Sequence, residues 1–227
     1  MILSYYNIAK CREDITEYVY HFTKGVNALG TLQQILEEGS IKDMQEREKE
    51  DYRICFTESP LKMQSTMFQT LESDKSFEYA PYGIGIKKEL LFKEGARPVI
   101  YGKYNEINDF PPNMHWRFVS YTPNIYDYSW QREWRLPKKE FCINPQNCIV
   151  IVKSKEEQQL LFEPLDIIMD GDVCDGEYHC SPTLKTERKY RSISLEEVEE
   201  LNNKKDIEDI IEKQHLGEKL YTSLGYL

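Results

Sequence analysis

Two short segments hold the side chains best suited to chemistry. Glu133 lies between Arg132 and Arg135, and tryptophans occupy positions 130 and 134. An unpaired carboxylate is costly to bury, so a glutamate in these surroundings indicates a cleft in which it is either used or paired. His21 lies in an aromatic and β-branched segment, where a positioned imidazole can hold a ligand group.

Both residues also have purely structural interpretations. His21 can be a buried histidine that bonds to the main chain. Glu133 can belong to an ion pair that holds its strand in place. Arg97, Arg117 and Arg135 can contact the phosphates of a nucleotide or remain solvated, and the sequence leaves both roles open.

Other motifs argue against several common sites. The segment Tyr82-Gly-Ile-Gly85 lacks the third glycine of a dinucleotide-binding fingerprint, which argues against a Rossmann domain. Cys174, His179 and Cys180 could suggest a metal site, but five residues separate each close cysteine pair and zinc sites usually have two to four. We therefore expect no metal. The acidic stretch from 170 to 175 lacks the terminal glutamate of a calcium loop.

Short strands and short helices alternate along the chain. Turn residues and apolar spacing predict strands at 18–23, 53–58, 82–86, 97–102, 129–136 and 148–152, with a possible strand at 164–169. They predict helices at 27–38, 60–71, 87–94 and 156–162. Residues 42–53 read as a solvated loop or helix, 104–125 as loop, and 170–182 as irregular. This order favours an α+β fold with a largely antiparallel sheet.

Length and charge bound the class of protein. The 227 residues carry a formal charge of −10, which argues against an extended surface that binds nucleic acid. No run approaches the roughly 18 apolar residues of a membrane span, and the six cysteines are too few for a disulfide scaffold. We expect a cytoplasmic protein without membrane contact. Residues 195–227 hold nine acids and four bases, so we divide the chain into a domain at 1–194 and an acidic helical tail at 195–227.

Five blocks occur in a recognisable order. They are Tyr20-His-Phe-Thr23, Ile54-Cys-Phe-Thr-Glu-Ser-Pro-Leu61, Tyr82-Gly-Ile-Gly-Ile-Lys-Lys88, Gly95-Ala-Arg-Pro-Val-Ile-Tyr101 and Arg132-Glu-Trp-Arg135. Together they resemble the AbiGi-type abortive-infection (phage-resistance) family, and the first block resembles the opening of ADP-ribosyltransferase-like domains. The resemblance covers roughly residues 18–152. It implies a split antiparallel β-sheet core with short helices, followed here by the helical tail.

The resemblance also implies NAD as substrate and a role for each matching residue. Glu133 would be the catalytic carboxylate beside the ribose, and Gln131 would orient the acceptor. His21 would hold a ribose hydroxyl, and Tyr82 would stack on the nicotinamide, with Tyr101 or Phe56 as substitutes. The implied NAD-binding residues are therefore His21, Phe22, Thr23, Phe56, Tyr82, Tyr101 and Arg132.

Two functions follow as expectations. The first is an ADP-ribosyltransferase of bacterial antiviral defence that modifies a protein or nucleic-acid acceptor or hydrolyses NAD. The alternative is a non-catalytic module, either an antitoxin-like protein that docks a basic toxin through the acidic tail or a sensor of a nucleotide signal. A related transferase acting on RNA ends is a third possibility, which the acidic balance opposes.

Overall fold

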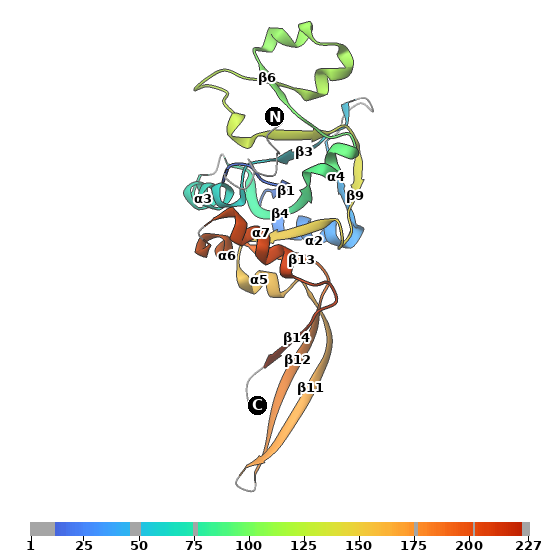
Figure 1. Ribbon diagram of the computed structural model, residues 1–227, viewed down its shortest axis with the longest axis vertical. Helices are drawn as coiled ribbons and strands as arrows, with labels where there is room; N and C mark the ends of the chain where they lie inside the picture. Colours follow the sequence, from blue (N-terminus) through green and yellow to red (C-terminus); the bar gives the residue numbers. More distant parts are fainter. Residues whose placement is uncertain (1–11, 46–50, 75–76, 175–176, 202, 224–227) are drawn as a thin grey trace, which may run out of the picture.

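A seven-stranded sheet forms the centre of the molecule (Figure 1). A computed structural model describes residues 12–45, 51–74, 77–174, 177–201 and 203–223. The strands follow the order β13 (Arg191–Ser194), β10 (Cys148–Val152), β4 (Tyr79–Lys87), β1 (Tyr18–Lys24), β3 (Ile54–Thr57), β8 (Glu133–Leu136) and β5 (Arg97–Pro98). Only β10 and β13 are parallel neighbours in this sheet. The expected α+β class with a largely antiparallel sheet is confirmed.

Alternate residues of the strands build a separate core on each face of the sheet. Val19 and Ile84 join the core beneath α2 (Ala28–Glu38) and α4 (Lys88–Lys93). Tyr18 and Tyr20 join the core beneath α3 (Leu61–Leu71), α6 (Leu195–Glu200) and α7 (Lys204–Lys213). This alternation follows from the period of two in a strand, so both faces of β1 are apolar.

The glycines of β4 allow β1 and β10 to approach closely. A Cβ atom at Gly83 would lie 2.6 Å from the main-chain oxygen of His21, and one at Gly85 would lie 2.6 Å from a side-chain carbon of Ile149. At Gly83 the backbone of β1 therefore leaves no room for a side chain.

A long β-hairpin extends away from the main sheet (Figure 1). Strands β11 (Phe162–Cys174) and β12 (Glu177–Arg188) pair along their whole lengths, and β14 (Lys219–Ser223) adds to β12. The prediction of an irregular stretch at 170–182 is wrong, because main-chain pairing across the hairpin forms strands without an alternating apolar pattern. The structure describes only the backbone at 170–174 and 177–181, so the side chains of Cys174, His179 and Cys180, considered above for a metal site, lie outside what it describes.

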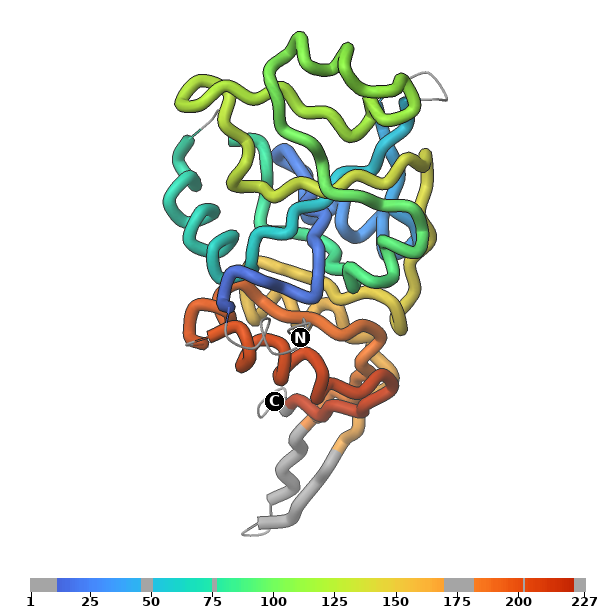
Figure 2. Tube along the Cα trace, turned by 45° about the horizontal axis from the view of Figure 1, so that its top comes forward, coloured from blue at the N-terminus to red at the C-terminus, as the bar shows by residue number. Residues whose placement is uncertain are grey.

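The acidic segment after Ser194 packs against the sheet. Its apolar side chains Leu195, Val198, Ile207 and Ile211 are all buried in the second core. Figure 2 shows this segment, in red, lying along the lower side of the main body. The division at residue 194 stays a prediction, but the helices after it complete one core of the main sheet.

Smaller elements complete the frame, and several differ from the expected boundaries. Strand β2 (Ser40–Lys42) pairs with β9 (Glu140–Cys142), and β6 (Ile100–Gly102) pairs with β7 (Phe118–Ser120). The 3-10 helices η2 (Tyr104–Asp109) and η3 (Pro112–Arg117) lie where loop was expected. Helix α5 (Lys155–Gln159) ends before Phe162. The strand expected at 129–136 begins only at Glu133, because 129–131 form the 3-10 helix η4 (Ser129–Gln131).

Both ribbon views place residues 100–128 in a lobe at the end of the molecule opposite the hairpin (Figures 1 and 2). Among the residues that the structure describes, no helix combines the length and the apolarity needed to cross a bilayer.

Candidate ligand cavity

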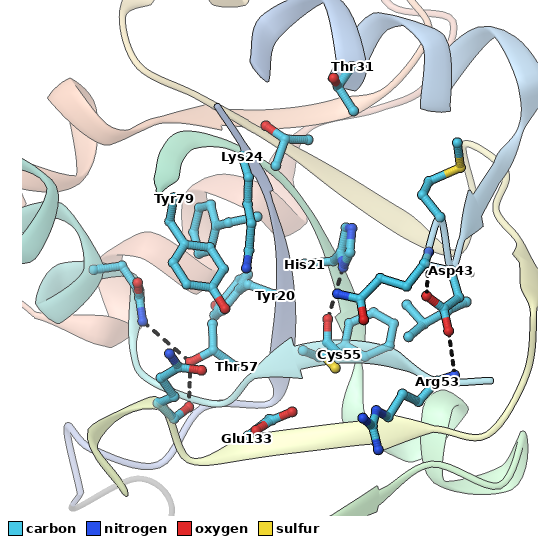
Figure 3. Close-up of a pocket in the computed structure, with 18 of the residues that line it drawn as sticks. Tyr20, His21, Lys24, Thr31, Asp43, Arg53, Cys55, Thr57, Tyr79 and Glu133 are labelled. Atoms are coloured by element: carbon cyan, nitrogen blue, oxygen red, sulfur yellow. Dashed lines mark hydrogen bonds between the residues drawn. The ribbon is translucent and has the colours of Figure 1, made fainter. Parts of the chain in front are cut away.

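The sheet opens between β1 and β3. These strands share one registered pair, Tyr20 with Thr57, and then diverge. A cavity of about 370 Å³ lies at this opening and is lined by β1, β3, β8, η4, the start of β4, α3 and residues 42–45 (Figure 3). Its volume is in the range of small-molecule sites.

His21 reaches the cavity from β1. Its Nδ1 donates a hydrogen bond to the carbonyl oxygen of Cys55 at 2.9 Å, and its ring lies edge-on to Phe56 at 5.8 Å. Burial lowers the pKa of the imidazole, and Lys24 lowers it further. A neutral ring that donates from Nδ1 presents Nε2 as an acceptor. This atom has no partner among the described residues and can accept a hydrogen bond from a ligand hydroxyl.

Thr23 lies two residues further along β1 and also lines the cavity. Its hydroxyl donates to the carbonyl oxygen of Tyr82 at 3.0 Å, which connects β1 to β4. Thr23 is buried, and this bond commits its only hydroxyl proton. The residue therefore shapes the cavity wall and fixes the path of β4 beside it.

Glu133 begins β8 at the opposite wall and is ion-paired with Arg135. The Arg135 Nε lies 2.7 Å from one carboxylate oxygen, and Nη2 donates to the other at 3.4 Å. Both side chains are 11% exposed. Cys55 is the registered neighbour of Arg135, and burial together with the Glu133 carboxylate raises the pKa of its thiol to about 12. The thiol is therefore neutral, and the Glu133–Arg135 ion pair is the ionic contact at this wall.

A strained turn delivers Gln131 and Glu133 to the cavity. Arg132 adopts a left-handed backbone conformation with φ of 48°, which is costly for a residue with a side chain. Its guanidinium donates to Glu58 at 3.3 Å and to the main chain of Asp14. Arg132 thus lies outside the cavity lining, while Gln131 and Trp130 on η4 line it. The main-chain oxygen of Gln131 accepts the hydroxyl of Thr57.

The aromatic candidates divide between the cavity and its surroundings. Phe22 and Phe56 line the cavity. Tyr82 does not, because its hydroxyl donates to Glu157 at 2.8 Å, and burial with this carboxylate raises the pKa of the phenol to about 12. Tyr101 lies behind Glu133, where its hydroxyl accepts the main-chain NH of Glu133 at 3.3 Å.

Several cavity residues were missed in the sequence. Tyr79 supplies an aromatic wall, and the ammonium of Lys24 lies 4.3 Å above its ring. Lys42 and Arg53 are also among the described residues that line the cavity. The ammonium of Lys42 lies 2.7 Å from Glu38, and that of Lys24 lies 3.7 Å from Glu78. Lys24 directly follows the block Tyr20–Thr23, and Arg53 directly precedes the block Ile54–Leu61. This proximity to the motif blocks could have identified both residues from the sequence. Nothing in the sequence indicated that Lys42 would join them, because it lies on β2, which is held by long-range pairing with β9.

No family model, curated protein or solved structure matches this chain. The interpretation of the cavity therefore rests on its own geometry and charge.

Proposed function

We propose that this cavity binds NAD and that the protein is an ADP-ribosyltransferase-like enzyme of the AbiGi-type abortive-infection family. The observation that carries the proposal is that His21 on β1 meets Gln131 and Glu133, which lie much later in the chain, at one cavity. The sheet opens between β1, which carries His21, and β3, which pairs with the strand of Glu133. This opening supports an ADP-ribosyltransferase-like fold.

The charges of the cavity suit each part of the dinucleotide. Lys24, Lys42 and Arg53 line the cavity and supply cations for the phosphates. Lys24 and Lys42 are ion-paired with Glu78 and Glu38, so a phosphate competes with these carboxylates for them. The Nε2 atom of His21 accepts a hydrogen bond from a ribose hydroxyl. Because Tyr82 is bonded to Glu157, we assign the stacking surface to Tyr79, which Phe56 can supplement.

Glu133 supplies negative charge where the reaction develops positive charge. The bond between C1′ of the ribose and nicotinamide breaks, and its electron pair leaves with the nicotinamide. The acceptor oxygen or nitrogen then forms the new bond to C1′ and loses its proton to Glu133 or water. A fixed carboxylate stabilises the oxocarbenium-like transition state, and Gln131 positions the acceptor.

Nicotinamide release from NAD tests this proposal directly. We expect the purified chain to release nicotinamide, with or without an added protein or nucleic-acid acceptor. Glu133→Gln should lower the rate by about 10²- to 10³-fold, the usual cost of removing one preorganised group. Glu94→Gln removes a carboxylate outside the cavity lining and is the matched control. Equal release by wild type and Glu133→Gln would refute the catalytic assignment.

A binding module without catalysis is the second candidate, and one observation favours it. Both carboxylate oxygens of Glu133 are held by Arg135, so the carboxylate is committed before any ligand enters. In this case calorimetry should detect binding of NAD or a cyclic nucleotide without any release of nicotinamide. The affinity should then survive Glu133→Gln and fall when Arg53 or Lys24 is neutralised.

A further inference from the structure

A second hollow lies on the same side of the sheet as α3. It has a volume of about 500 Å³ and is bounded by α3, the start of β4, α5 and α6. We call it the α3–α6 groove. Its apolar and aromatic lining residues, which we call its floor, include Phe68, Leu71, Phe77, Tyr79 and Leu195.

The charges at the groove differ in sign from those of the ligand cavity. The carboxylates of Glu72, Glu156, Glu196 and Glu199 line the groove, and all four residues are exposed. Among the residues that the structure describes, Lys153 is the one cation lining the groove, and its ammonium lies 2.8 Å from Glu72. Tyr79 lines both hollows, so the ligand cavity and the groove share one side chain.

The walls of the groove are held together before any partner arrives. The hydroxyl of Ser65 on α3 donates to Glu199 on α6 at 2.6 Å. The ammonium of Lys62 donates to the carbonyl oxygens of Val198, Glu199 and Leu201 at the end of α6. A preformed groove lowers the ordering cost of binding.

We propose that the α3–α6 groove docks a basic segment of a partner protein, with lysine or arginine side chains at its carboxylate rim and an apolar side chain on its floor. The apolar floor disfavours a simple polyamine, and the carboxylates repel nucleic-acid phosphates. A second copy of this chain carries a charge of −10 and approaches against electrostatic repulsion. This docking site does not depend on the function proposed for the ligand cavity.

Fluorescence anisotropy with a labelled short peptide that alternates lysine and leucine tests the docking site on the full chain. We expect saturable binding that weakens as salt rises. A peptide with serine in place of leucine and one with glutamate in place of lysine should both bind more weakly, because each removes one half of the complementarity.

The decisive variant is Glu72→Gln/Glu156→Gln, which removes two exposed carboxylates without adding charge. Exposed rim charges contribute weakly to binding, so the affinity should fall about threefold to thirtyfold. The control Glu37→Gln/Glu89→Gln makes the same charge change on α2 and α4, and Glu89 is ion-paired with Lys93 as Glu72 is with Lys153. Thermal melting verifies that both variants are folded.

Three outcomes would overturn the proposal. They are absence of binding to the wild-type chain, equal weakening by the control variant, and equal affinity for the lysine–serine peptide. Sedimentation of the chain without peptide tests whether a second copy occupies the groove. A dimer that dissociates in Glu72→Gln/Glu156→Gln would assign the groove to a second copy and also overturn the proposal.

Discussion

At the scale of single residues, Arg135 determines whether Glu133 can remain charged in its buried position. Besides the ion pair, Arg135 donates to the carbonyl oxygens of Trp116 and Phe118. Arg135→Leu should lower the free energy of unfolding by about 3 kcal/mol, because it leaves a buried carboxylate without its partner. Urea denaturation measures this loss.

The double variant Glu133→Leu/Arg135→Leu separates the lost charge partner from the lost contacts to Trp116 and Phe118. It should recover part of the stability, since no unpaired charge stays buried. If the double variant is as unstable as Arg135→Leu or less stable, the cost does not come from the carboxylate. Burial of the Glu133 carboxylate in the cavity wall would then not depend on the ion pair with Arg135.

His21 predicts a dependence of stability on pH. Its pKa in the folded chain is lowered by burial, whereas the unfolded chain has the ordinary value near 6.5. The unfolded state therefore binds more protons as the pH falls below about 6.5, and the folded state loses stability from there down to its own pKa. The melting temperature of wild type should fall more steeply between about pH 6.5 and 5 than that of His21→Gln. Parallel curves would show that His21 does not make this contribution.

At the scale of elements, the contact between β4 and β1 depends on Gly83. Gly83→Ala places a methyl group against the main-chain oxygen of His21, which cannot rotate away. We expect a loss of about 2–3 kcal/mol in unfolding free energy. Gly85→Ala meets the side chain of Ile149, which can adjust in part, so it should cost less. Chemical denaturation of the two variants compares them, and an equal or reversed order would contradict this interpretation.

The ammonium of Lys62 connects α3 to the end of α6, where it satisfies three carbonyl oxygens. Lys62→Met keeps the aliphatic stem and removes these bonds, so α6 should lose about 1–2 kcal/mol of local stability. Relative to wild type, hydrogen exchange in Lys62→Met should accelerate in α6 and α7, whereas exchange in β10 should change less. Lys93→Met removes an exposed lysine on α4 and should leave this exchange unchanged.

At the scale of the whole molecule, the acidic C-terminal helices contribute to the fold itself. A chain that ends at Ser194 loses the buried side chains of Leu195, Val198, Ile207 and Ile211. Burial of each contributes about 1.5–3 kcal/mol, and the sum is comparable to the total stability of a domain. Thermal scans should therefore show no cooperative melting of this truncated chain.

A second truncation provides the control. A chain that ends at Glu218 loses β14, which pairs only with β12 among the described strands. It should keep the cooperative transition of the main sheet. Cooperative melting of the shorter chain at the wild-type temperature would instead show that residues 195–227 are an independent appendage.

The sequence by itself determined the α+β class, the strands at Tyr18, Ile54 and Cys148, and His21, Gln131 and Glu133 as the residues to examine. The class and the strands follow from local apolar patterns, and His21 and Glu133 stood out by their neighbours along the chain, whereas Gln131 followed from the resemblance of the motif blocks. Only the tertiary structure decided that Tyr82 bonds to Glu157, that Arg132 bonds to Glu58, and that Lys42 joins the cavity. The face to which a side chain turns and the strand that lies beside it depend on register and long-range pairing, and neither is encoded by spacing along the chain.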